Sequence, residues 1–157
     1  MNKITISFEG IKNAPWLEET EPFIQAVLKK LEKRNWDLSI LYCNNTIIRT
    51  LNKEYRNRDE PTDALSFVMG ETQGYRFIPG DIVVSLEMIE ENARYFGVSP
   101  GEELRRLLIH GILHLAGMEH ASNDYGEPML ILQEKLLEEI QALSFECLST
   151  RRIGEAE

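Results

Sequence analysis

The sequence predicts one α+β domain in which about five helices pack on a mixed four-stranded sheet. Three observations support this class. Short β-branched segments are interleaved with longer segments whose apolar residues recur at helical spacing. Two of the predicted strands are joined by a loop alone, which indicates a hairpin within the sheet. The chain has 157 residues, 43% hydrophobic and 27% charged, as is usual for a single globular domain. We expect the domain to span residues 1–149, followed by a polar tail at 150–157.

The predicted strands are short and rich in β-branched residues. They cover residues 3–8 (KITISF), 37–42 (DLSILY), 64–69 (ALSFVM) and 81–85 (DIVVS). The segment ETQGYRFIPG between the last two is predicted to be a loop, with Gly74 and Gly80 as turn points.

Helices are predicted where apolar residues share one helical face, at about 16–34, 45–55, 86–97, 100–116 and 128–143. The fourth helix has the clearest limits. Ser99 opens a capping box with Glu102, Pro100 takes the first helical position, and Gly117 is a left-handed terminator. Its second half, LLIHGILHLAG, is apolar almost all round and should be buried.

Composition narrows the classes of function. No apolar run approaches the roughly 20 residues that cross a bilayer, and the N-terminus lacks the apolar block of a signal peptide. We therefore expect a cytoplasmic protein with no membrane partner. A net charge of −9 argues against broad, charge-driven binding to nucleic acid, although a local basic cleft remains compatible with it. Cys43 and Cys147 lie far apart in the chain, and buried or idle thiols are favoured over a disulfide.

All three histidines fall within the stretch HGILHLAGMEH. His110 and His114 are four residues apart and project from one helix face, so both rings can reach one ion. Gly117 then ends the helix and lets the chain bring in His120 as a third ligand. Three nitrogen ligands leave the fourth position of a tetrahedral ion open, as in catalytic zinc sites. We expect one zinc ion, while imidazole also suits nickel, copper or iron.

The histidine spacing matches that of metzincin proteases, but the catalytic glutamate of those enzymes is absent. Gly111 stands in its place and cannot accept a proton. Met129 could be compared with the methionine turn of that family, yet its position at the start of a predicted helix favours core packing. A zinc peptidase is therefore the weaker interpretation.

Three blocks in the same order resemble the YbeY-like proteins, bacterial rRNA maturation factors described as metal-dependent endoribonucleases. HGILHLAGMEH resembles the signature H-G-x-L-H-L-x-G-x-D-H. Residues 52–67 (NKEYRNRDEPTDALSF) are similar to N-x-x-Y-R-x-x-D-x-P-T-D-V-L-S-F, and residues 80–85 (GDIVVS) to G-D-I-x-I-S. One departure is Glu119, which stands where the family usually has aspartate.

The resemblance implies a zincin-like metal helix and a single-strand-preferring, zinc-dependent endoribonuclease. Its substrate would be an rRNA precursor, cut in maturation of the 3′ end of small-subunit rRNA and in ribosome quality control. Small-subunit ribosomal proteins and an assembly GTPase are implied as partners, and DNA is not expected. The resemblance also implies that Arg56 lies near the metal cleft, where a guanidinium can grip a phosphate, and that His114 matters for activity. Arg58 is a weaker candidate.

The general base is left open by the sequence. Glu119 is the tentative candidate, whereas Asp124, Ser66 and Asp81 have no spacing argument. Asp63 and Asp81 could instead cap turns, which is the commoner role for aspartate beside threonine or glycine. Since no base stands out, a non-catalytic ribosome-assembly factor stabilised by its metal is the main alternative.

Overall fold

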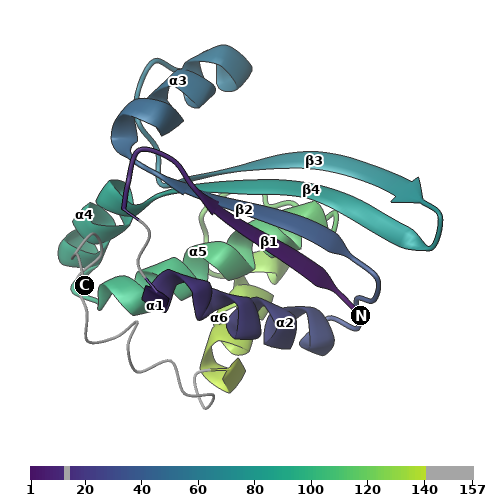
Figure 1. The fold of residues 1–157 in the computed structure, drawn as a ribbon. Coiled ribbons are helices and arrows are strands. Elements are labelled where there is room, and N and C mark those ends of the chain that lie inside the picture. Colours follow the sequence, from purple (N-terminus) through teal and green to yellow (C-terminus); the bar gives the residue numbers. More distant parts are fainter. Residues whose placement is uncertain (13–14, 141–157) are drawn as a thin grey trace.

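The structure, a computed structural model, describes residues 1–12 and 15–140, without the side chains of Pro15 and Trp16. Its sheet contains β1 (Lys3–Phe8), β2 (Asp37–Cys43), β3 (Ala64–Gln73) and β4 (Arg76–Ser85) in the order β1-β2-β4-β3 (Figure 1). β1 and β4 run parallel to β2, and β3 runs antiparallel to β4. The predicted α+β class and mixed four-stranded sheet are confirmed.

The helices are α1 (Pro15–Glu18), α2 (Thr20–Lys30), α3 (Asn45–Arg56), α4 (Leu86–Phe96), α5 (Pro100–Leu115) and α6 (Pro128–Ile140). The single helix predicted for residues 16–34 was wrong, because the chain breaks at Glu19 and α2 ends at Lys30. Pro22 cannot donate a backbone hydrogen bond, so it fits the first turn of a new helix and not the middle of a long one. Beyond α2, Glu32 and Asn35 have positive φ values of 57° and 59°.

The segment ETQGYRFIPG is mostly strand, which corrects the predicted loop. β3 and β4 continue through it and are joined by a two-residue turn at Gly74 and Tyr75. Gly74 is a turn point, with φ of 62°, but Gly80 lies within β4 opposite Val68. Gly80 has φ of 142°, and a Cβ there would lie 1.9 Å from the Phe67 carbonyl oxygen. The glycine therefore allows β3 and β4 to approach closely beside the register shift between Val68 and Glu71.

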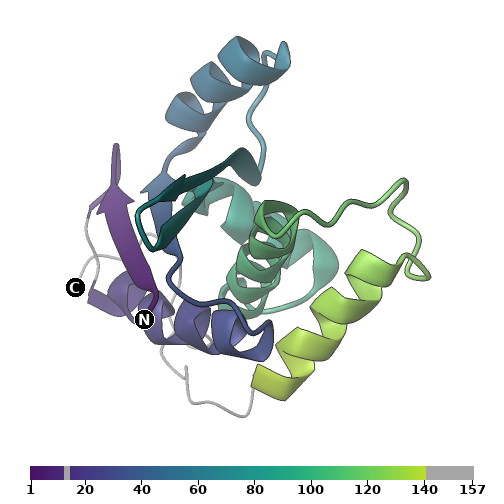
Figure 2. The same ribbon diagram turned by 90° about the vertical axis from the view of Figure 1, so that its right-hand side faces the viewer.

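The helices divide between the two faces of the sheet. α3 lies alone on one side, over a small buried cluster of Cys43, Ile48, Leu65 and Val83 (Figure 1). The main core lies on the other side, where α2, α5 and α6 pack. α5 is central, because it contacts β3 and β4 on one flank and α6 on the other (Figure 2). Met129 is fully buried in this core, as predicted from its position.

The ends of α5 agree with the prediction. The Ser99 hydroxyl accepts a hydrogen bond from the Glu102 N–H at 3.1 Å, Pro100 is the first helical residue, and Gly117 follows the helix with φ of 95°. Asn44 likewise caps α3 by accepting from the Ile47 N–H at 3.0 Å. Among residues 1–12 and 15–140, no helix has the length and apolar character that a membrane span requires.

Some predictions fall outside the described residues. These are the last turn of the final helix, residues 141–143, the tail at 150–157 and Cys147. Cys43 is buried, and burial raises the pKa of its thiol to about 12. The thiol is therefore an unreactive part of the core under α3.

Candidate metal centre and its cleft

The three histidines come together at the end of α5. His110 and His114 lie one turn apart on that helix, and the loop after Gly117 carries His120 back to them. One nitrogen from each ring lies within 4.8 Å of the others, and the Nε2 atoms of His110 and His114 are 3.0 Å apart. The structure therefore has the three-nitrogen arrangement that the sequence spacing predicts.

Each ring is oriented through its other nitrogen. The Nδ1 atom of His114 lies 3.1 Å from the Met118 carbonyl oxygen, and that of His120 lies 2.8 Å from the Ser122 carbonyl oxygen. A carbonyl oxygen only accepts hydrogen bonds, so Nδ1 carries the proton in both rings. In the neutral rings, the Nε2 lone pairs are therefore available as ligands.

His110 is oriented by a side chain of α6. Its Nδ1 lies 2.6 Å from Oε1 of Gln133, while Nε2 of Gln133 donates to a Glu134 carboxylate oxygen at 3.0 Å. Glu134 is itself held by Arg106, which donates through Nε at 3.0 Å and Nη2 at 3.1 Å. Because the amide nitrogen of Gln133 is used by the carboxylate, its oxygen faces His110. The proton of His110 is therefore also on Nδ1.

Two facing lone pairs at 3.0 Å repel each other unless a cation lies between them. Burial lowers the pKa of both His110 and His114, so protonation of these rings is disfavoured. Two nitrogens at 2.0–2.1 Å from a tetrahedral ion are about 3.3 Å apart, close to the observed spacing. The residues therefore fit a metal ion, and an all-imidazole set suits zinc and other transition metals.

Gly111 lies at a close contact between α5 and the sheet. A Cβ at this position would lie 2.9 Å from Ile82 Cδ1 and 3.2 Å from Ser66 Oγ. Ile82 is fully buried, so the glycine allows the helix to pack on β3 and β4. A glutamate as in metzincins would crowd the side chains of Ile82 and Ser66 at this contact.

The metal centre opens into a cleft of about 1020 Å³, here called the histidine cleft. Its walls come from α3 and β3 on one side and from α4, α5, α6 and the 117–125 loop on the other. The residues that line it include Arg56, Asp63, Ser66, Phe96, Val98, Glu103, Arg106, His110, Gly111, His114, Glu119, Tyr125, Gln133 and Glu134.

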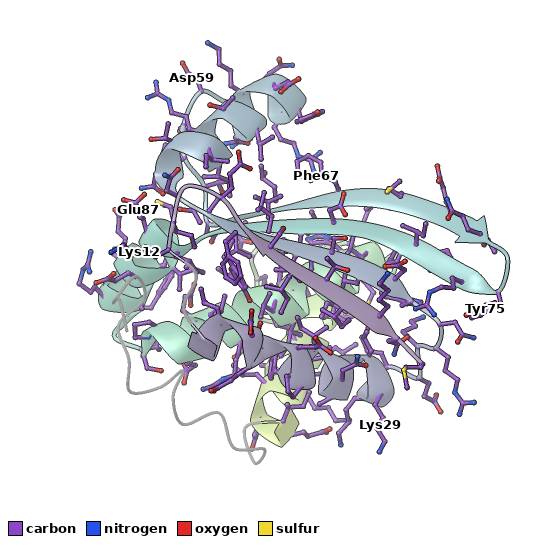
Figure 3. All side chains as sticks on the ribbon, viewed as in Figure 1. Lys12, Lys29, Asp59, Phe67, Tyr75 and Glu87 are labelled. Atoms are coloured by element: carbon purple, nitrogen blue, oxygen red, sulfur yellow. The ribbon has the colours of Figure 1, made fainter. Side chains whose placement is uncertain are left out.

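Arg56 lies in this cleft, as the resemblance implied. One of its guanidinium nitrogens donates to the Ser66 carbonyl oxygen at 2.8 Å, and the group lies 5.6 Å from the Phe67 ring centroid. Within the described part of the chain it forms no ion pair with a carboxylate. Nearby Arg49, in contrast, is paired with Asp59 at 2.8 Å. Asp59 lies at the outer side of α3, whereas Phe67 lies between α3 and the strands (Figure 3).

Of the weaker candidates for catalytic residues, some line the histidine cleft and others do not. Glu119 is exposed and lines the histidine cleft, and Ser66 lines it as well. Asp124 does not line it, because its carboxylate closes a turn by accepting from the Gly126 N–H at 2.8 Å. Asp81 lies in β4, where its backbone pairs with β3, and it does not line the histidine cleft either. Arg58 borders a smaller neighbouring pocket, which it shares with Arg56.

Asp63 lines the cleft but is occupied by structural bonds. Its carboxylate accepts from the Ala64 N–H at 2.7 Å and from the Asn92 side chain at 3.1 Å. These contacts agree with the turn-capping role that the sequence favoured for this residue.

Sequence reasoning missed Gln133, Glu134 and Arg106. The final helix was interpreted only as amphipathic, from its apolar positions. One signal was present, since Gln133 falls three residues after Leu130 and four before Leu137, on the buried face. A polar residue on an apolar helix face needs a hydrogen-bond partner, and here the partner is a ring of the metal centre.

This chain is similar to known proteins over most of its length. The sequence model of the family Endoribonuclease YbeY matches residues 4–141. A protein of Treponema pallidum named Endoribonuclease YbeY is 46% identical over 142 residues, covering 87% of this chain and 89% of the relative. Its namesake in Treponema denticola is 50% identical over 122 residues, covering 74% and 79%.

A solved structure also resembles this chain. The solution structure of a Thermotoga maritima protein superposes with a TM-score of 0.65 at 35% identity, covering 88% of this chain and 89% of that one. The described fold and the order of its elements are thus shared with a solved relative. The family match covers most of the chain, including all three histidines and Arg56. This protein belongs to the Endoribonuclease YbeY family.

Proposed function

We propose that this protein is a metal-dependent endoribonuclease that cleaves single-stranded RNA. Its role would be in maturation of the 3′ end of small-subunit rRNA and in ribosome quality control. One observation supports the proposal most strongly. The facing Nε2 atoms of His110 and His114 line the same cleft as the guanidinium of Arg56, which forms no ion pair with a carboxylate among the described residues. A cation site beside an unpaired guanidinium suits a phosphodiester. The names of the relatives indicate that this phosphodiester belongs to RNA.

The metal is proposed to be one zinc ion, held by His110, His114 and His120. Such an ion would supply Lewis acidity that activates water near neutral pH and withdraws charge from a phosphate. The protein contributes fixed rings, because each Nδ1 is held by an acceptor. Rings that are already oriented lose little freedom when the ligand set forms.

Arg56 is proposed to bind the scissile phosphate. One of its nitrogens donates to the Ser66 carbonyl oxygen, and the other N–H groups of the guanidinium can donate to phosphate oxygens. This contact and the Phe67 ring fix the guanidinium before substrate binds. Charge that develops on the phosphate is thereby stabilised without rearrangement of the side chain.

Glu119 is proposed as the proton acceptor for the attacking water. It follows Met118, whose carbonyl orients His114, and precedes His120, so the loop that completes the metal centre also carries this carboxylate. It is exposed and lines the histidine cleft, so a water molecule in the cleft can reach the carboxylate. Glutamate in place of the usual aspartate preserves the carboxylate with a longer reach.

Residues 1–149 are proposed to form the single catalytic domain of a cytoplasmic protein. Small-subunit ribosomal proteins and an assembly GTPase are its proposed partners, on the strength of the resemblance alone. The negative net charge suits protein partners, while the RNA is gripped locally at Arg56.

The test uses an rRNA precursor fragment and casein, each with and without a chelator. We expect cleavage of the RNA alone, and its loss with chelator. Cleavage of casein would favour a zinc peptidase. If the protein carries its metal but does not cleave the RNA in the absence of chelator, the non-catalytic assembly factor is favoured.

A further inference from the structure

We infer that the end of the histidine cleft between α4 and the start of α5 is a nucleobase subsite, in which Phe96 stacks on an unpaired base of the RNA. This inference rests on the proposed endoribonuclease function and adds how the substrate strand lies in the cleft. Three observations support it: an exposed aromatic ring, the charge near the start of α5 in the same cleft, and the position of both relative to Arg56.

The first observation is the ring itself. Phe96 is the last residue of α4 and lines the cleft together with Val98, yet 63% of its surface is exposed. Tyr95 packs against it edge to face, with ring centroids 5.0 Å apart, so the orientation of Phe96 is restrained. An exposed, oriented ring in the wall of a cleft is a platform on which a base can stack.

The second observation is the charge near the start of α5, in the same cleft as the ring. The Arg106 guanidinium is surrounded by three carboxylates, with contacts of 3.3 Å to Glu102, 3.6 Å to Glu103 and 3.0 Å to Glu134. Three negative charges against one positive charge repel a phosphate at this end of the cleft. Carboxylate oxygens can instead accept hydrogen bonds from the amino groups of cytosine and adenine. This end therefore suits the base of a nucleotide and not its backbone.

The third observation is the contrast with the opposite wall. Arg56, in the α3 and β3 wall, has no carboxylate partner among the described residues and is the natural contact for phosphate. Glu103 precedes His110 by seven residues, about 10 Å along α5, whereas Glu134 lies nearer to the metal centre, because Gln133 joins it to His110. The strand would thus pass its backbone over Arg56 and the metal, with a neighbouring base turned toward Phe96. A base held in a duplex cannot enter, which accounts for a preference for single strands.

The experiment measures binding of a short single-stranded RNA to the metal-loaded protein by fluorescence anisotropy, with phosphorothioate linkages in the RNA so that it resists cleavage. Phe96→Ala is expected to weaken binding by about 5- to 100-fold, the usual effect of losing one stacked base. Phe96→Leu keeps the apolar packing without the ring and should also weaken binding, whereas Phe96→Trp should retain it. Tyr75→Ala is the matched control, since Tyr75 is 77% exposed at the tip of the β3–β4 hairpin, away from α4 (Figure 3).

A second arm uses RNAs in which one nucleotide at a time lacks its base. If Phe96 stacks on a particular base, the loss caused by Phe96→Ala should vanish for the RNA that lacks that base. The inference is overturned if Phe96→Ala, with a melting temperature near that of the wild type, binds RNA as Tyr75→Ala does. It is equally overturned if the loss is the same for every abasic RNA. These results differ from failure of the proposed function, in which the wild type itself would neither bind nor cleave the RNA.

Discussion

The Nε2 atoms of His110 and His114 lie 3.0 Å apart, and the Nδ1 atom of each ring faces an acceptor. Both rings are therefore fixed with their lone pairs directed at each other. Burial disfavours the protonated form of either ring, so a metal cation is the partner that best resolves this contact.

The contact between Gln133 and His110 should set the affinity for the metal. Replacement Gln133→Leu removes the acceptor of the Nδ1 proton and is expected to weaken metal binding by about 10- to 100-fold. Gln133→Glu keeps an acceptor and should bind the metal at least as tightly as the wild type. Competition with a chromophoric chelator measures both. A Leu variant with wild-type affinity would show that Gln133 does not orient the ring.

Gly111 should not tolerate the glutamate of metzincins. Gly111→Glu forces a Cβ against Ile82 and a charged group into the helix–sheet contact, so we expect a loss of about 3 kcal/mol or more in the free energy of unfolding. Urea denaturation measures the loss. Gly126→Glu is the control, because a Cβ at Gly126 meets only Asp124 at an ordinary 3.4 Å. Equal stability of the two variants would contradict the packing argument.

Arg56 should act on the substrate and not on the metal. Arg56→Ala is expected to lower kcat/KM for RNA cleavage by about 10²- to 10³-fold, with unchanged metal content. Arg56→Lys keeps the charge without the planar fork and should recover only part of the activity. Arg49→Ala, which removes a cation paired with Asp59, serves as the control. Unchanged cleavage by Arg56→Ala alone would contradict this role, and unchanged cleavage by both Arg56→Ala and His114→Ala would point to a contaminating ribonuclease.

Glu103 should make stability depend on pH. Burial raises the pKa of this carboxyl above its ordinary value of 4.5, because the charged form is desolvated. The unfolded chain therefore ionises first, and the contribution of Glu103 to stability is lost as pH rises from 4.5 through the folded pKa. Relative to Glu103→Gln, the wild type should become less stable over that range. Urea denaturation at pH 4, 5.5 and 7 measures the difference, and a constant difference would contradict the raised pKa.

Local sequence signals predicted much of the fold. Ser99, Pro100 and Gly117 set the limits of α5 because caps act through hydrogen bonds within a few residues. The four-residue spacing of His110 and His114 predicted a shared face for the same reason. Features that depend on contacts between distant residues are harder to predict from the sequence. The hairpin extension of β3 and β4 was missed because Gly80 serves a close strand approach, which has the same sequence signature as a turn.

The parts of the site that depend on tertiary packing could not be predicted. Gln133 reaches His110 only because α6 packs alongside α5, and no spacing within either helix reports that contact. Phe96 is an apolar residue at the end of a predicted helix, which gives no sign that it lies exposed in the cleft wall. Arg56 came into the account through the resemblance, because an arginine in a charged loop is otherwise most simply a solvated side chain.

The most direct test of the central claim is cleavage of a small-subunit rRNA precursor by the wild type and by His114→Ala, with metal content measured on both proteins. We predict that the wild type carries about one ion per chain and cleaves the RNA, and that a chelator abolishes cleavage. His114→Ala should lose both the ion and the activity. Full retention of the metal, or unchanged cleavage by His114→Ala, would contradict the assignment of this centre.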